Sequence, residues 1–179
     1  IYASYGMLLS GLQDFKSGNF AGKVALAVME AFPAREFEVR VINLMYSYIN
    51  PWKNLLKDSI YSLKQSIPIG IESGDFEYTG YVINHYSQFI FFAGFELINV
   101  AQEISSCCQV LKAYREEGTL LVIEIFQQTV LNLLNSSDTP WQLDGEVFKE
   151  FQHVQEWERN GLFILNAVVY INKLMLSVM

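Results

Sequence analysis

Few side chains in this chain have types and spacings that could do chemistry, and His85 is the first of them. It stands in the polar stretch 84–88. If this stretch is helical, Tyr81, His85 and Gln88 share one face, because residues three and four apart are neighbours on a helix. Such a face could form the polar floor of a pocket. The alternative, which we favour, is a histidine held in the core or in a groove by hydrogen bonds.

His153 and Glu156 are three residues apart, a spacing that suits two metal ligands on one helix. A zinc site needs three or four ligands, and neither a second histidine nor a cysteine lies near this pair in the sequence. We therefore expect no metal site here, and no cofactor for the chain as a whole.

Cys107 and Cys108 are the two cysteines of the chain, and adjacent residues do not easily close an ordinary disulfide. Both fall on the apolar stripe of a predicted helix. We expect inert packing rather than redox activity, because a reactive thiol needs exposure and a lowered pKa. Since there is no framework of paired cysteines, we expect a reducing, cytoplasmic location.

Catalytic and nucleotide-binding signatures are missing from the sequence. It contains no G-x-x-x-x-G-K-[ST] loop, no G-x-G-x-x-G and no nucleophile elbow. An enzyme built on helices would need carboxylates or histidines that converge, and the sequence offers scattered ones. Glutamates 116, 117, 124, 156 and 158 are typical of solvated helix faces. We expect no catalytic activity from this chain.

The charge pattern excludes two classes of partner. The net charge is -7, and no Lys or Arg occurs between Gln65 and Leu111. Nucleic-acid binding needs clustered cations to neutralise phosphates, so we expect none. An anionic membrane surface is disfavoured for the same reason.

Gly and Pro breaks divide the sequence into nine segments, mostly of helix length, without strand-like alternation. With 51% hydrophobic and 17% charged residues, many of these helices must be covered on more than one face. Three breaks resemble one another, at residues 17–20, 73–76 and 93–96. Helix pairs are predicted to begin about 40 residues apart, the spacing of stacked helical hairpins. The predicted starts are near Arg35, Asp75, Gly118 and Asn160.

Periodicity predicts how each helix is buried. Residues 96–115 follow the i, i+3, i+4 rhythm of a helix with one wet face, whereas 81–93 and 120–134 are apolar nearly all round. Asn19 and Asp75 are predicted N-caps. A helix after Asn19 is predicted to carry a one-sided apolar stripe of Val24, Val28 and Phe32.

Prolines and loops predict local departures from regular helix. Pro68 is expected to kink a helix near Lys64, and Pro51 to stand at a helix start. Residues 136–145 form the one long break, which is either an ordered loop or a docking site for a partner.

The last segment, 161–179, has about the length of a membrane span. Because Asn166, Asn172 and Lys173 interrupt it, we predict a buried helix of a solenoid instead. No signal peptide is visible. Since the chain opens on Ile1 and stops inside an apolar helix, we interpret residues 1–179 as a helical-repeat fragment of a longer protein.

Six short structural motifs are spread along essentially the whole chain. They are 70–78 (Gly-Ile-Glu-Ser-Gly-Asp-Phe-Glu-Tyr), Asn84-His85-Tyr86, Phe91-Phe92-Ala93-Gly94, 2–6 (Tyr-Ala-Ser-Tyr-Gly), Trp52-Lys53 and Asn172-Lys173-Leu174. In these motifs the sequence resembles the long helical region of large multidomain signalling kinases of cyanobacteria.

This resemblance implies a parent with a serine/threonine kinase domain, a P-loop ATPase, the helical region, and GAF and histidine-kinase modules. By the same resemblance the fragment is similar to the tetratricopeptide-like sensor arm of STAND-type switches. It departs from the tetratricopeptide consensus in its first helix and in a repeat longer than 34 residues. None of the parent's kinase or nucleotide-binding motifs occurs here.

We therefore predict an all-α fold, a right-handed solenoid of antiparallel helix pairs that is tetratricopeptide-like. The expected function is a non-catalytic sensor or regulatory protein-interaction module of a signalling kinase. Its partners would be the ATPase and sensor domains of the parent, or a protein or small-molecule effector. The alternative is an architectural spacer or a homodimerisation segment. The residues predicted to line a concave binding face are Arg40, Asn43, Ser47, Tyr81, Asn84, His85, Gln88, Glu124, Gln127 and Gln128.

Overall fold

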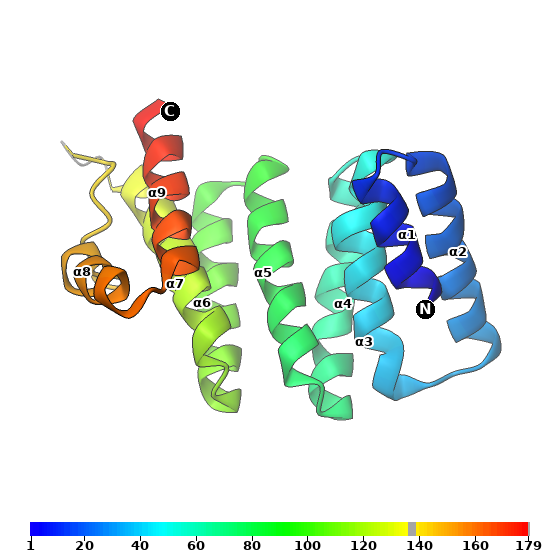
Figure 1. The fold of residues 1–179 in the computed structure, drawn as a ribbon. Coiled ribbons are helices and arrows are strands. Elements are labelled where there is room, and N and C mark those ends of the chain that lie inside the picture. Colours follow the sequence, from blue (N-terminus) through cyan, green and yellow to red (C-terminus); the bar gives the residue numbers. More distant parts are fainter. Residues whose placement is uncertain (136–138, 179) are drawn as a thin grey trace. The chain divides into compact units, whose positions relative to one another are not determined.

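The computed structural model describes residues 1–135 and 139–178 (Figure 1). The chain divides into two compact units. The first unit is Ile1–Gly94 and the second is Phe95–Met179. Within the described ranges the regular structure is helical, apart from one isolated β-bridge between Asp144 and Lys149. The prediction of an all-α fold is confirmed.

The first unit is built on two pairs of consecutive helices and on α3, which packs against the second pair. Consecutive helices α1 and α2 pack together, as do α4 and α5, and α3 contacts both members of the second pair. A π-helix, η1, and a 3₁₀ turn, η2, connect α3 to α4. The elements are α1 (Tyr2–Gly11), α2 (Phe15–Ala31), α3 (Arg35–Asn43), η1 (Leu44–Ile49), η2 (Asn50–Trp52), α4 (Lys57–Ser73) and α5 (Phe76–Phe92).

The predicted break at residues 17–20 is wrong, because these residues lie inside α2. The helix begins at Phe15, and the Asp14 carboxylate accepts a hydrogen bond from the Ser17 amide; Asn19 is buried and is not an N-cap. Gly18 does not form a turn but lies at the contact between α1 and α2. A Cβ at Gly18 would lie 2.8 Å from the Gly6 carbonyl oxygen, so the missing side chain lets α1 and α2 approach closely.

The turn between α4 and α5 follows the sequence prediction. Gly74 adopts a left-handed conformation with φ of 75°, which a glycine tolerates without strain. The Asp75 carboxylate accepts from the amide of Tyr78 and caps α5, as predicted. Pro68 lies inside α4. Pro51 lies in η2, six residues before α4 begins at Lys57.

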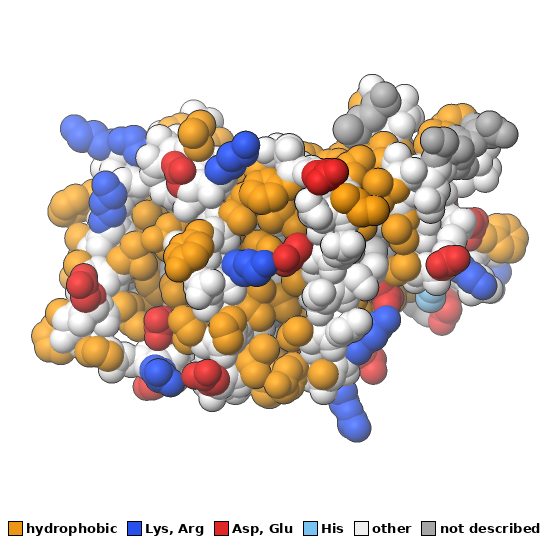
Figure 2. Space-filling model, turned by 180° about the vertical axis from the view of Figure 1, so that it is seen from behind, with side chains coloured by type: hydrophobic (Ala, Val, Ile, Leu, Met, Phe, Trp, Pro, Cys, Tyr) orange, Lys and Arg blue, Asp and Glu red, His pale blue; other side chains and the backbone are white. Residues whose placement is uncertain are grey.

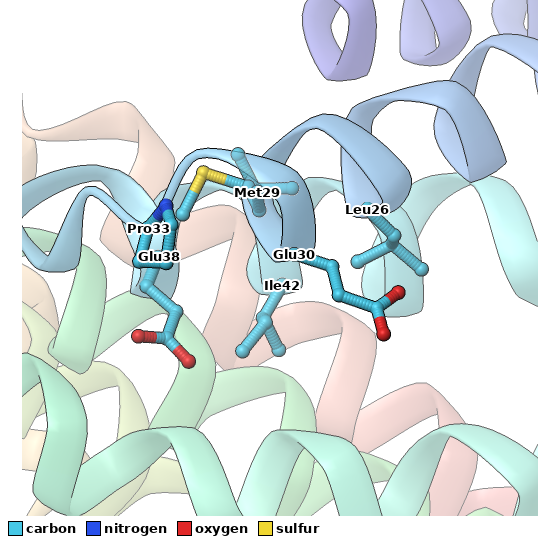
Figure 3. A pocket seen from close by; sticks show the side chains of 7 residues that line it. Leu26, Met29, Glu30, Pro33, Glu38 and Ile42 are labelled. Carbon is cyan, nitrogen blue, oxygen red and sulfur yellow. The ribbon is translucent and has the colours of Figure 1, made fainter.

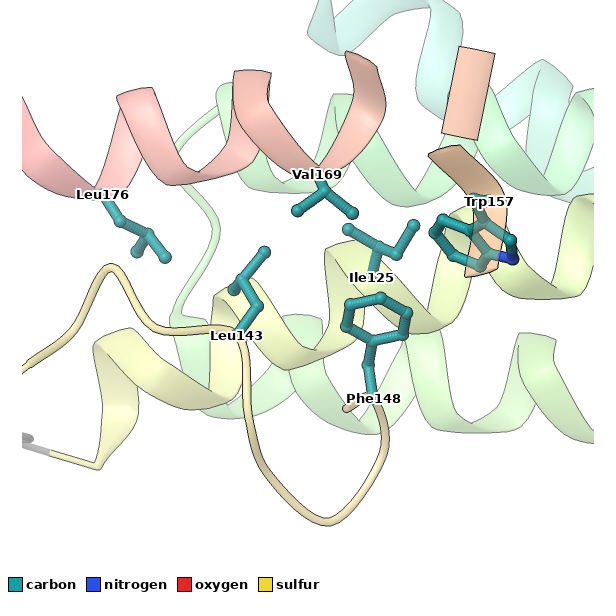
Figure 4. Packing of buried hydrophobic residues seen from close by; sticks show 6 residues of the cluster. All are labelled: Ile125, Leu143, Phe148, Trp157, Val169 and Leu176. Carbon is teal, nitrogen blue, oxygen red and sulfur yellow. The ribbon is translucent and has the colours of Figure 1, made fainter. Parts of the chain in front are cut away.

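The second unit contains α6 (Leu97–Tyr114), α7 (Glu117–Leu134), α8 (Glu150–Asn160) and α9 (Phe163–Val178). The predicted pair starts at Arg35, Asp75, Gly118 and Asn160 fall within three residues of the starts of α3, α5, α7 and α9. The predicted pairing is wrong at two of them, because α5 packs with the preceding α4 and α7 with the preceding α6, so Asp75 and Gly118 begin the second helix of a pair and not the first. The core of this unit joins α7, α8 and α9 to the segment that connects α7 to α8 (Figure 4). Its buried residues are Ile125, Leu143, Phe148, Trp157, Val169 and Leu176.

The described part of the predicted loop, residues 139–145, is packed and hydrogen-bonded. Leu143 is fully buried, and the Gln128 amide oxygen accepts from the backbone amides of Val147 and Phe148 just beyond it. Residues 136–138 of the predicted loop lie outside the described residues. Residues 139–145 are therefore held by hydrogen bonds and by the buried Leu143, whereas Trp141, Gln142 and Asp144 are exposed, and the alternative of a docking site stays a prediction.

The prediction that the last helix is buried is wrong for one of its faces. The α9 helix buries Asn166, Val169, Asn172 and Leu176, whereas large apolar side chains on its other face are exposed. Periodicity showed which residues share a face, but not which face the rest of the unit covers. In the described residues no helix is long and apolar enough to cross a membrane.

Candidate functional site

The first seven predicted site residues belong to neighbouring elements of the first unit. Helix α3 and η1 carry three of them and α5 carries four, and α3 packs against α5. We call this region the α3–α5 surface. Its residues are Arg40, Asn43, Ser47, Tyr81, Asn84, His85 and Gln88.

Arg40 anchors one end of the α3–α5 surface. Its Nε atom donates to the Asp75 carboxylate at 2.5 Å, and its guanidinium lies 4.9 Å from the centre of the Tyr78 ring. The hydrogen bond to Asp75 raises the pKa of Arg40 above its ordinary value. Tyr81 packs edge-on against Tyr78, at 5.5 Å, and donates its hydroxyl to Glu77. The charges at this end of the surface are therefore already paired.

His85 is held in place by its own helix and by two aromatic rings. Its Nδ1 lies 2.7 Å from the Tyr81 carbonyl oxygen and therefore carries the donated proton. The Tyr48 and Phe89 rings lie edge-on to it at 4.9 and 6.1 Å. Burial lowers the pKa of His85, so the imidazole is neutral at pH 7. The interpretation of a histidine held by hydrogen bonds is confirmed.

The amides and the hydroxyl of the α3–α5 surface bond to one another. The Ser47 hydroxyl donates to the Asn43 side chain at 3.1 Å, and Gln88 donates to Asn84 at 3.1 Å. Asn43 is also buried, so it presents nothing to a partner. The most exposed side chains of the surface are Tyr81, 40% exposed, and Arg40, whereas the other members apart from Asn43 are half-buried.

The remaining three predicted site residues belong to α7, in the second unit, and are engaged there. Glu124 forms an ion pair with Lys112 at 2.9 Å. Gln127 and Gln128 are buried: the first accepts from the Cys108 thiol and the second holds the segment that follows α7. Sequence periodicity placed them on one helix face but could not show that this face is internal.

The other candidate chemical groups are also packed inside the second unit. Cys107 and Cys108 are buried, and burial raises the pKa of Cys108 to about 12, so its thiol stays protonated. The His153 ring stacks against the rings of Phe148 and Trp157, at 5.3 and 5.1 Å, and these two rings also contact each other. Among the residues that the structure describes, no three His, Cys, Asp or Glu side chains come together as metal ligands would.

A groove between α2 and α3 is a site that the sequence analysis missed. It encloses a cavity of about 360 Å³ whose lining is mostly aliphatic. A second cavity of about 190 Å³ shares Met29 and Val41 with it and extends the groove towards α1. The residues that line the larger cavity are Leu26, Met29, Glu30, Pro33, Glu38, Val41 and Ile42.

Two carboxylates give this groove its charge. Glu30 comes from α2 and Glu38 from α3, and Figure 3 shows them on either side of Ile42. Neither forms an ion pair with a described residue, and no Lys or Arg lines either cavity. The groove is therefore apolar inside, with uncompensated negative charge beside it.

Exposed hydrophobic side chains surround the groove. The predicted apolar stripe of α2 is wrong, because Val28 and Phe32 are 42% and 74% exposed and the buried residues of α2 are small. Phe37, on the facing helix, is 50% exposed. Hydrophobic side chains also reach the surface widely in the space-filling view (Figure 2). The cluster of large apolar residues around Pro33 was the signal in the sequence that could have indicated this site.

Comparison with known proteins adds no further assignment, because no protein family, curated protein or solved structure matches this chain.

Proposed function

We propose that this chain is a non-catalytic regulatory module that binds a peptide segment in the groove between α2 and α3. The segment would insert an apolar side chain into the cavity and carry Lys or Arg beside it. The observation that carries the proposal is the pair of unpaired carboxylates, Glu30 and Glu38, on an otherwise apolar cavity. Such a site should bind a partner that is both apolar and cationic more tightly than one that is apolar alone.

The size of the groove is consistent with this ligand. A cavity of about 360 Å³ lies within the range of pockets that bind small ligands or single large side chains. A helical segment with apolar anchors at i and i+3 or i+4 is the usual occupant of such a groove. The exposed Phe32 and Phe37 provide further apolar contact around it.

The resemblance to cyanobacterial signalling kinases suggests where the partner segment would lie. In this proposal it belongs to the ATPase or sensor domains of the same parent protein, or to an effector protein. Binding would favour one arrangement of the parent over another and so shift its population between states. The finer fold assignment, a right-handed, tetratricopeptide-like array, is part of the proposal and is supported by the packing of α1 with α2, α4 with α5, and α6 with α7.

The experiment that tests this proposal compares synthetic helical peptides of about 12 residues, or three turns. One series places Leu and Phe anchors beside Lys, and the other places the same anchors beside Glu. We expect fluorescence anisotropy to show binding of the Lys series only. The Glu30→Gln/Glu38→Gln variant should weaken that binding by roughly 2- to 30-fold, because each solvent-accessible charge pair is worth about 0.2–1 kcal/mol.

Glu36→Gln is the matched control, since Glu36 lies on α3 together with Glu38 but is exposed and does not line the groove. It should leave the affinity unchanged. Equal binding of the two peptide series, or equal effects of the Glu36 and the Glu30/Glu38 variants, would overturn the proposal.

A further inference from the structure

The exposed face of α9 is apolar from one end of the helix to the other. Its six large side chains are between 51% and 81% exposed. Residues 163–178 contain one charged side chain, Lys173, and it is paired with Glu150 of α8. We call this face the α9 seam. Its residues are Phe163, Ile164, Ala167, Tyr170, Ile171, Leu174 and Val178.

Helix α9 is apolar on both faces, unlike an ordinary surface helix, because its inner face also buries Val169 and Leu176. Its inner face buries Asn166 and Asn172, and the second of these accepts from Thr129 and donates to the Val168 carbonyl. Its outer face holds aliphatic and aromatic residues. A helix whose inner face already fills the core and whose outer face still exposes Ile and Leu has a second apolar contact to make.

The spacing of the α9 seam is that of a helix–helix interface. Ile164, Ile171 and Val178 fall on one position of a heptad, and Ala167 and Leu174 fall on the other apolar position. β-Branched residues at the first position with Leu at the second favour pairs of helices. Phe163 and Tyr170 flank this stripe and widen it.

We propose that the α9 seam pairs with the α9 seam of a second copy of this chain. Because the seam itself is uncharged, no like charges meet within the contact, although the net charge of -7 on each chain repels the other copy at longer range. The six large side chains expose on the order of 700 Å² together, taking about 150–200 Å² for each when fully open. That is close to the ~800 Å² that each partner contributes to a standard interface. A dimer related by a two-fold axis that covers the whole seam would therefore have an interface slightly below standard size.

This inference does not depend on the proposed peptide groove, which belongs to the first unit. The two heptads of the seam are too few for a long coiled coil. The dimer would instead be a contact of two short helices, each supported by the core of its own unit. Ile171 lies at the centre of the seam, so an axis passing there brings the two Ile171 side chains together whether the helices run parallel or antiparallel.

Sedimentation equilibrium of the 179-residue chain tests the proposal. We expect a dimer at micromolar concentrations, and Leu174→Asp should raise its dissociation constant roughly 100-fold or more, because a buried charge would replace a central apolar contact. Leu55→Asp is the matched control, since Leu55 is 73% exposed and lies in the first unit. A monomeric wild-type chain, or a dimer that Leu174→Asp leaves intact, would overturn the proposal.

A cross-linking experiment keeps the test valid if Leu174→Asp unfolds the chain. Ile171→Cys should form a covalent dimer on mild oxidation, whereas Ile98→Cys, at an exposed position of α6, should not. The native thiols are buried in both variants. Equal cross-linking of the two variants, or none in either, would contradict a contact centred on Ile171.

Discussion

Leu143 lies in the irregular segment between α7 and α8, and its truncation tests how the second unit is held together. The side chain is fully buried in the cluster formed with Ile125, Phe148, Trp157 and others (Figure 4). Its backbone is fixed on both sides: its amide donates to the Glu150 carboxylate at 3.2 Å, and its carbonyl accepts from the Glu150 amide at 3.0 Å. A cavity left at this position cannot collapse freely.

The expected cost of Leu143→Ala follows from these contacts. Substitutions of buried Leu by Ala cost about 2–5 kcal/mol, more where the site cannot relax. The fixed backbone places Leu143→Ala near the middle of this range, at about 3 kcal/mol. For a unit of this size, about 3 kcal/mol lowers Tm by more than roughly 10 °C.

Thermal unfolding followed by near-ultraviolet circular dichroism measures this cost, because Trp157 lies in the same cluster. Leu55→Ala is the control, since it removes the same atoms from a side chain that is 73% exposed. We expect the control to change stability by less than about 0.5 kcal/mol. A loss of under about 1 kcal/mol for Leu143→Ala would refute the packing of this segment against α7 and α9.

Three further predictions follow from the packing. Gly18→Ala should lower the free energy of unfolding in urea by about 1–3 kcal/mol, because its Cβ would lie 2.4 Å from the Ser10 hydroxyl. Gly11→Ala is the control and should not destabilise the chain, because its Cβ meets nothing within 4 Å. Burial lowers the pKa of His85, so its neutral form stabilises the fold; stability from this group is complete above about pH 6.5 and is lost as the pH falls through the lowered folded-state pKa. A His85→Gln variant should lose that part of the pH dependence of urea unfolding, and an unchanged profile would contradict it. Because the pKa of Cys108 is raised to about 12, iodoacetamide at pH 8 should modify it slowly in the folded chain and rapidly in urea; fast modification of the folded chain would show that the thiol is accessible.

The sequence predicted the helices better than it predicted their surroundings. Gly74 and Asp75 were interpreted correctly, because a left-handed glycine and a capping carboxylate act through their own backbone. Gly18 was misread as a break, since a glycine that allows two helices to approach has the same local appearance as one that ends a helix. Periodicity identified α9 as a helix but could not tell that its Asn-containing face is the buried one.

The candidate site was predicted in part for the same reason. Arg40, Tyr81 and His85 do lie on neighbouring helices of one unit, but their polar groups bond within that unit. The groove between α2 and α3 depends on the distance between two helices and on which carboxylates remain unpaired. Local sequence patterns predict neither the distance between the helices nor the pairing of the carboxylates.

The measurement that tests the central claim most directly is a methyl NMR titration of the chain with the Lys-flanked peptide. The Met29 methyl group lines both cavities of the groove, Ile42 lines the larger one, and Met175 of α9 lies outside the groove. Our account predicts that the signals of Met29 and Ile42 shift on binding while that of Met175 stays in place. If the Met29 and Ile42 signals stay in place when the peptide is added, the assignment of the groove as the binding site is contradicted, whether or not other signals shift.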